Sequence, residues 1–281
     1  MNLKKIYPPR KPWCHKGDFG YVLVISGSEI YSGSPIFNAL GALRSGADLT
    51  MIIGAKRAVN IAACFLPDII TYPLDKDLDL KHLPIIFSLA KKFNSLVIGC
   101  GLKRDKKTQK VIRKIIKKID LPMIIDAEGI RALAEEKETI KGKNVILTPN
   151  SEEFRILTGE KPSTNIEQRK IKVKKWAKKL KTVILLKGHI DVISNGEKVL
   201  LNKTGSPYMT KGGFGDILSG ICASLLARGI SPLDTAYIAA YINGLAGEIG
   251  AKKFGPGMLA SDILPLIPKV ILKCRSNKNN F

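Results

Sequence analysis

Short apolar runs alternate with longer amphipathic segments along most of the chain. The apolar runs are continuous rather than alternating, and they cover residues 21–26, 49–53, 95–98, 122–125, 145–147 and 182–186. Strands that are buried on both faces of a parallel sheet have this pattern. Helical spacing is found between them, over about 34–45, 81–93, 106–119 and 166–180. The alternation predicts an α/β fold with a doubly wound, mostly parallel sheet flanked by helices.

The pattern changes in the last third of the chain. Residues 191–201 carry Asn195-Gly196 between two strand-like runs, which predicts a hairpin and therefore an antiparallel edge to the sheet. A glycine-rich turn follows, and then a helix that we expect from Asp216 to about Arg228. No repeat or low-complexity linker divides the sequence, so we expect one domain over residues 1–281, with a disordered tail from about residue 274.

Small and polar residues recur where the predicted parallel strands end. These ends carry Gly27-Ser28, residues 99–101, Asp126, residues 148–150 and Lys187-Gly188. In open α/β sheets, ligands bind beyond the carboxyl ends of the strands. The sequence therefore predicts the active site at this edge.

The charge balance is strongly basic, with 46 lysines and arginines against 24 acidic residues and a net charge of +22. Two segments, 103–118 and 169–181, supply much of the excess. Both interleave basic and apolar residues at helical spacing, which is typical of solvated helix faces. Nucleic-acid binding is the alternative, but neither segment has the clustered aromatic residues or the motif that usually accompany it.

Cysteine and histidine usage gives no sign of a disulfide framework or a zinc site. The five cysteines are widely spaced without a CxxC pair, and the three histidines are scattered, which fits a cytoplasmic protein. The basic N-terminal segment has no apolar stretch, so we expect no secretory signal. No apolar run approaches the roughly 20 residues of a membrane span, so we expect no membrane segment.

The most informative stretch is KGGFGDILSG, residues 211–220. Glycines leave backbone N–H groups uncovered, and the helix that follows places partial positive charge at the same end. This combination predicts an anion hole for phosphate at Gly212, Gly213, Phe214 and Gly215. Asp216 could accept a proton there from an attacking hydroxyl. Alternatively, Asp216 only caps the helix, because aspartate is a favoured N-cap residue.

Other segments have a recognisable order and spacing relative to that motif. They are His15-Lys16-Gly17 with residues 20–46, 97–102 (VIGCGL), 124–127 (IIDA), 147–153 (LTPNSEE), 186–188 (LKG) and 211–216 (KGGFGD). Together they resemble the signatures of the ADP- or ATP-dependent NAD(P)H-hydrate dehydratases, repair enzymes of the ribokinase-like fold. The resemblance covers nearly the whole chain.

The resemblance implies a reaction at the nicotinamide ring of hydrated NADH or NADPH (NADHX or NADPHX). ADP or ATP phosphorylates the ring hydroxyl, phosphate then leaves, and NADH or NADPH is regenerated, with AMP or ADP as the second product. Mg²⁺ is the implied cofactor. Phosphoryl transfer depends mainly on positioning and charge stabilisation, which the glycine-rich helix end and Asp216 would supply.

The resemblance also implies two groups of binding residues. The hydrated dinucleotide would be held by Ser34, Gly101, Asn150 and Asp216. The nucleotide would be held by Lys187, Gly188, His189, Ile190, Asp191 and Gly215. Asp126 could bind Mg²⁺ through water, although aspartate is also a common turn residue, and we expect no residue to be a direct metal ligand. Ser34 could equally be a helix N-cap ahead of Pro35.

The chain departs from the family pattern at four positions. Cys100 replaces a usual proline, Lys103 a glycine, and Asn150 a common histidine; Phe214 stands where threonine, serine or methionine is usual. Asn150 can form hydrogen bonds but cannot carry a proton. A small-molecule kinase of the same fold, such as a vitamin-precursor kinase, is the other enzymatic possibility. By resemblance we expect a homo-oligomer, possibly a tetramer, and a separate epimerase in the same pathway.

Overall fold

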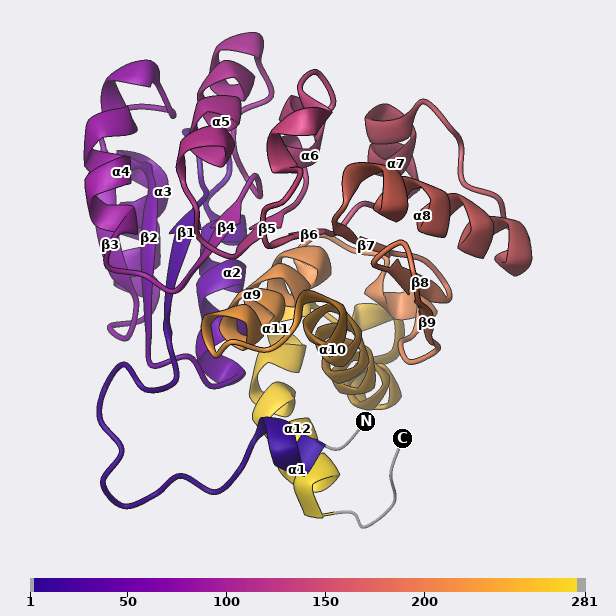
Figure 1. Cartoon of the computed structure of the whole chain (residues 1–281). Coiled ribbons are helices and arrows are strands. Elements are labelled where there is room, and N and C mark those ends of the chain that lie inside the picture. Colours follow the sequence, from indigo (N-terminus) through magenta and orange to yellow (C-terminus); the bar gives the residue numbers. More distant parts are fainter. Residues whose placement is uncertain (1–2, 277–281) are drawn as a thin grey trace.

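A nine-stranded sheet organises residues 3–276, the part of the chain that the computed structural model describes (Figure 1). The strand order is β3-β2-β1-β4-β5-β6-β7-β8-β9, parallel from β3 to β7 and antiparallel between β7, β8 and β9. The strands are β1 (Tyr21–Ile25), β2 (Leu49–Ala55), β3 (Ile70–Leu74), β4 (Ser95–Ile98), β5 (Met123–Ile125), β6 (Val145–Leu147), β7 (Val183–Leu186), β8 (Asp191–Ser194) and β9 (Val199–Asn202). The predicted parallel sheet with an antiparallel edge is confirmed.

Helices cover both faces of the sheet (Figure 1). One layer contains α1 (Leu3–Ile6), α2 (Gly33–Arg44), α3 (Lys56–Phe65), α9 (Phe214–Ala227), α10 (Pro232–Phe254), α11 (Ala260–Ile263) and α12 (Ile267–Ser276). The other contains α4 (Leu83–Ala90), α5 (Lys106–Lys118), α6 (Glu128–Leu133), α7 (Ser151–Thr158) and α8 (Ile166–Leu180). Short 3-10 turns are η1 (Leu80–His82), η2 (Lys137–Ile140), η3 (Pro207–Met209), η4 (Gly255–Gly257) and η5 (Leu264–Leu266).

The central strands explain why their sequences show no alternation. In β1, Val22 and Val24 pack into the core beneath α2 and α9, whereas Leu23 and Ile25 pack into the core beneath α4 and α5. Side chains of a strand point alternately to the two faces. Since helices cover both faces, every position of the strand favours an apolar residue.

Two glycines let α2 and α9 pack closely. A Cβ atom on Gly220 of α9 would lie 2.1 Å from the backbone oxygen of Asn38, and one on Gly41 of α2 would lie 2.5 Å from that of Ile217. Neither approach is possible for a residue with a side chain. The contact fixes the position of α9, whose N-terminal turn carries the glycine-rich motif.

Element ends differ from the predictions in a few places. Helix α2 begins at Gly33 with Ser32 at the N-cap, so Ser34 does not cap it; Gly46, with φ +105°, follows its C-terminus as predicted. Of the predicted tail, residues 274–276 belong to α12 and residues 277–281 lie outside the described residues.

The two basic segments form helix faces in contact with solvent, as predicted. In α5 the apolar residues are buried and the lysines are exposed. In α8 most lysines are exposed, the apolar Ile171 is exposed as well, and one basic residue is buried. That residue is Arg169, which is buried and donates a hydrogen bond to the backbone oxygen of Lys187 over 2.7 Å. Among the helices of residues 3–276, none has the length and apolar character that crossing a bilayer requires.

Candidate active site

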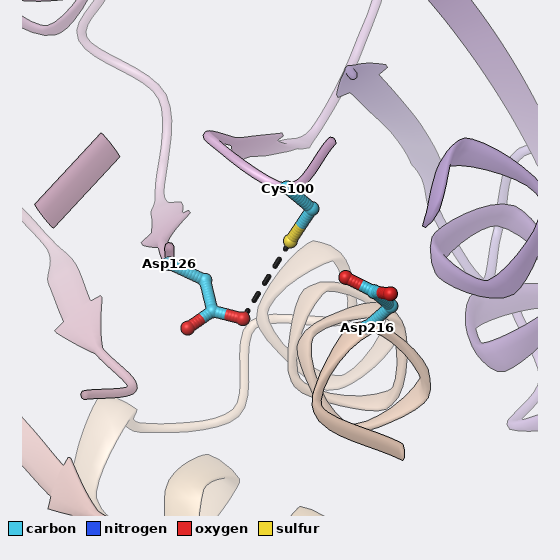
Figure 2. Close-up of side chains that lie close together, drawn as sticks. All are labelled: Cys100, Asp126 and Asp216. Atoms are coloured by element: carbon cyan, nitrogen blue, oxygen red, sulfur yellow. Dashed lines mark hydrogen bonds between the residues drawn. The ribbon is translucent and has the colours of Figure 1, made fainter. Parts of the chain in front are cut away.

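Side chains from several strand ends converge on Asp126, the residue that follows β5. Its Oδ1 accepts a hydrogen bond from Lys187 Nζ at 3.0 Å, and its Oδ2 accepts one from Ser219 Oγ at 3.1 Å. The Cys100 thiol donates to the same Oδ2 over 3.6 Å (Figure 2). Asp126 and Cys100 are buried. The predicted edge of the sheet therefore does hold a polar cluster.

Asp216 lies opposite Asp126 and Cys100, with its carboxylate directed toward the thiol (Figure 2). Helix α9 begins at Phe214 and has Gly213 at its N-cap, with φ +101°. Asp216 is therefore inside the first turn, and the cap interpretation is wrong. The prediction was two residues late because Phe214 and Gly215 already belong to the helix.

Asn38 of α2 ties the start of α9 to this cluster. Its amide donates to the backbone oxygen of Asp216 over 2.8 Å and to Cys100 Sγ over 3.5 Å. Phe214, which departs from the family pattern, is buried in the core and anchors the first turn. The position of Asp216 is therefore set by packing and by a buried hydrogen bond.

Burial and neighbouring charges shift the pKa values of the ionisable groups in the cluster. Burial raises the pKa of Asp216 to about 6, and the negative charge of Asp126 adds to the rise; hydrogen bonds from Cys100 and Ser34 and the charge of Lys187 oppose it. Burial also raises the pKa of Glu153, as does Asp126. For Lys187, burial disfavours the ammonium form, but Asp126 and Glu153 more than offset it and the pKa is raised. Lys187 therefore stays charged, while Asp216 can exchange a proton near neutral pH.

The residues predicted to form an anion hole lie at the N-terminal end of α9. The first backbone hydrogen bond of the helix runs from Ile217 N–H to the Gly213 oxygen over 3.0 Å, so the N–H groups before it have no partner within the helix. A Cβ at Gly212 would meet no atom within 4 Å, whereas one at Gly215 would lie 3.3 Å from Lys187 Nζ. Lys211 Nζ holds the loop by donating to the backbone oxygens of Pro256 and Met258.

Of the predicted nucleotide residues, 187–190 form the turn between β7 and β8, and Asp191 begins β8. Asp191 stabilises this turn: its Oδ1 accepts from Gly188 N–H at 2.9 Å and its Oδ2 from Asn202 at 2.9 Å. Gly188 and His189 are exposed, and Ile190 is half-buried. Of these five residues, only Lys187 forms a hydrogen bond with Asp126.

The predicted substrate residues fall in two places. Ser34 and Gly101 are neighbours, since a Cβ on Gly101 (φ +61°) would lie 2.8 Å from Ser34 Cβ. Ser34 lies beside Asp216, where its hydrogen bond to the carboxylate lowers the pKa of Asp216. Asn150 caps α7, because its Oδ1 accepts a hydrogen bond from Glu153 N–H at 2.9 Å. The Glu153 carboxylate in turn accepts one from Asn150 N–H at 2.8 Å.

Residues that the sequence reasoning left out complete the cluster. Ser219 and Asn38 lie inside helices and gave no signal, whereas Glu153 and Cys100 stood within matched segments without an assigned role. No direct metal ligand was expected. Yet the structure places ligand atoms of Cys100, Asp126 and Asp216 within 4.8 Å of one another.

Comparisons with known proteins agree with this arrangement. A family model described as NAD(P)H-hydrate dehydratase matches residues 22–269. The chain belongs to the NAD(P)H-hydrate dehydratase family. It is 40% identical to the ADP-dependent (S)-NAD(P)H-hydrate dehydratase of Cenarchaeum symbiosum over 273 residues, 96% of this chain and 94% of the relative.

Other members of the dehydratase family are longer. The chain is 42% identical to the bifunctional NAD(P)H-hydrate repair enzyme Nnr of Pyrobaculum aerophilum over 259 residues, which are 91% of this chain and 51% of that protein. The chain thus spans about half the length of these bifunctional relatives.

Solved structures of other proteins have the same fold as this chain. The ADP/ATP-dependent NAD(P)H-hydrate dehydratase of Bacillus subtilis, co-crystallised with ATP/Mg²⁺, is 26% identical with a TM-score of 0.81 and covers 97% of this chain and 96% of its own. Arabidopsis thaliana ribokinase, at 17% identity and a TM-score of 0.60 over 92% of this chain and 99% of its own, shares the fold alone. The predicted ribokinase-like fold is confirmed.

Proposed function

We propose that the chain catalyses nucleotide-dependent dehydration of hydrated NADH or NADPH, with Asp216 as the catalytic base. The observation that supports this most is the position of Asp216 in the first turn of α9, directly after Gly215, where a Cβ atom would lie 3.3 Å from Lys187 Nζ. A half-buried carboxylate with a pKa of about 6 is ionised at neutral pH and still takes up a proton readily. The family relatives named as dehydratases support the same activity.

The proposed reaction has two steps. In the first, the ring hydroxyl oxygen attacks the terminal phosphorus of ADP or ATP, Asp216 takes the hydroxyl proton, and AMP or ADP leaves. In the second, the carbon–oxygen bond breaks as the ring nitrogen donates electrons, phosphate departs, and a proton leaves the neighbouring ring carbon. Phosphate is a far better leaving group than hydroxide, which is why the dehydration needs a nucleotide.

Each part of the cluster has a role in the proposal. The glycines 212, 213 and 215 and the start of α9 would stabilise the charge on the transferring phosphoryl group. Residues 187–191 would contact the nucleotide, and Ser34, Gly101 and Asn150 the hydrated dinucleotide. Mg²⁺ would come with the nucleotide phosphates and meet Asp126 through water, since Mg²⁺ gives up its water ligands reluctantly.

Three further parts of the proposal concern the protein's setting. We place it in the cytoplasm, which suits its free cysteines. We propose a homo-oligomer, possibly a tetramer. We also propose that a separate epimerase interconverts the two forms of the hydrate.

The direct test supplies purified protein with hydrated NADH, Mg²⁺ and either ADP or ATP. We expect nucleotide-dependent return of dihydronicotinamide absorbance together with one phosphate released per NADH formed. If neither nucleotide regenerates NADH, the proposed function is wrong. A kinase of this fold would regenerate no NADH; supplied with a vitamin precursor, it would leave a stable phosphorylated product.

A further inference from the structure

A thiol and two carboxylates meet at the centre of the candidate active site. The ligand atoms of Cys100, Asp126 and Asp216 all lie within 4.8 Å of one another and come from three separate elements (Figure 2). The thiol is the unusual member, because proline is usual in the family at this position. Nothing in the proposed reaction uses it.

The spacing of the thiol and Asp126 suits a tetrahedral metal ion. Zinc bonds of about 2.3 Å to sulfur and about 2.1 Å to oxygen, at the tetrahedral angle, hold the two ligand atoms about 3.6 Å apart. The separation from Cys100 Sγ to Asp126 Oδ2 is 3.6 Å. The ligand atom of Asp216 lies within 4.8 Å of the other two, and Asp216 would complete three protein ligands and leave a fourth position for water, as in zinc sites that are not closed.

The charges around the cluster also favour a divalent cation. Asp126, Asp216 and Glu153 are faced by the ammonium of Lys187, which lies 3.0 Å from Asp126 and 4.0 Å from Glu153. When all four groups are ionised, two negative charges remain uncompensated in a partly buried region. A divalent cation bound among them would compensate both charges.

A buried amide side chain faces the thiol. The side chain of Asn38 is fully buried and donates to Cys100 Sγ over 3.5 Å, which would stabilise a thiolate. Its Oδ1 atom has no hydrogen-bond partner among the described residues. The amide is therefore placed to hold the sulfur in position.

We infer that Cys100, Asp126 and Asp216 bind a thiophilic divalent cation such as Zn²⁺, and that this cation inhibits the enzyme. Thiolate ligands select zinc-like ions, whereas Mg²⁺ prefers oxygen, so the two cations would share Asp126 but only the thiophilic one would bind Cys100. Binding releases the thiol proton to water and occupies Asp216, which then cannot accept a proton from substrate. The inhibition rests on the proposed function; the binding does not.

Binding can be tested with Co²⁺, which reports thiolate ligation by a charge-transfer absorption band. We expect one Co²⁺ per chain with this band, and its loss when Zn²⁺ is added in excess. Cys100→Ala should abolish the band, and Asp126→Asn should weaken Co²⁺ affinity at least about 10-fold, since even outer-shell partners contribute that much. Circular dichroism checks that both variants fold.

Cys64→Ser is the matched control, because Cys64 is an exposed thiol to which no role is assigned. It should keep the band. Persistence of the band in folded Cys100→Ala, its loss in Cys64→Ser, or no band in the wild type would each overturn the inference.

Inhibition is measured separately, by adding Zn²⁺ at fixed Mg²⁺ to the NADH-regeneration assay. We expect the wild type and Cys64→Ser to lose turnover together as Zn²⁺ is raised. Equal sensitivity of Cys100→Ala, measured on whatever turnover it retains, would contradict inhibition at this site. If no protein regenerates NADH, the proposed function fails, but the Co²⁺ result stands by itself.

Discussion

Replacing Asp216 with asparagine should make the folded protein more stable at pH 8. Burial and the neighbouring Asp126 disfavour the ionised carboxylate and raise its pKa from 3.8 to about 6. The native state therefore binds this proton more tightly than the unfolded chain. Stability falls as pH rises from about 3.8 to about 6 and stays at the lower level above that range. Asparagine has the same shape and carries no charge, so it avoids this loss.

The size of the effect follows from the shift in pKa. A difference of about two pH units corresponds to about 3 kcal/mol at pH 8, where the carboxylate is ionised in both states. At pH 4.5 the carboxyl is protonated in the native state but mostly ionised in the unfolded chain. The same relation then gives a loss of native stability of about 1 kcal/mol. The gain from Asp216→Asn should therefore shrink as pH falls.

Urea unfolding of both proteins at pH 8 and pH 4.5 measures this directly. Asp234→Asn is a matched control, because Asp234 holds the same place in the first turn of α10, where it contacts Ser231. It should lose up to about 1 kcal/mol of helix-terminus stabilisation. If Asp216→Asn is no more stable than wild type at pH 8, or gains equally at both pH values, Asp216 does not have the environment described.

Two other outcomes are expected. The value of kcat/KM should be constant above about pH 7 and fall about tenfold per pH unit below an apparent pKa of about 6, since a base must be unprotonated. A constant value down to about pH 5 would contradict this. Changing the exposed Lys110, Lys114 and Lys117 of α5 to glutamine should leave turnover within about a few fold of the wild type, because solvated charges contribute little to stability. Loss of tight nucleic-acid binding in that variant would instead favour nucleic-acid binding as the function.

The central strands were predictable because burial on both faces requires an unbroken apolar run. Strand β3 was not predicted: it lies at the sheet edge, is partly exposed and contains Pro73, so its sequence has neither a continuous run nor an alternation. Helix α10 was also missed. Glycines 244, 247 and 250 interrupt its apolar pattern, because each lies where a side chain would strike a neighbouring residue.

The site was predictable where strand ends determine it. Asp126 follows β5 and Lys187 follows β7, two parallel strands with β6 between them, so topology places both residues at the same edge of the sheet. Ser219 and Asn38 were not predictable, because they reach the cluster only through the close contact of α2 with α9 at Gly41 and Gly220. Such a contact depends on three-dimensional packing that no local pattern records.

The central claim is that Asp216 accepts the proton of the attacking hydroxyl, and turnover of Asp216→Asn tests it most directly. The variant keeps the helix and the shape of the site but cannot take up a proton at neutral pH. With hydrated NADH, Mg²⁺ and saturating nucleotide, we expect turnover to fall at least about 100-fold. Nucleotide affinity should stay the same or rise slightly, because a charge that repels phosphate is removed. A folded variant that keeps most of the wild-type turnover would contradict the account.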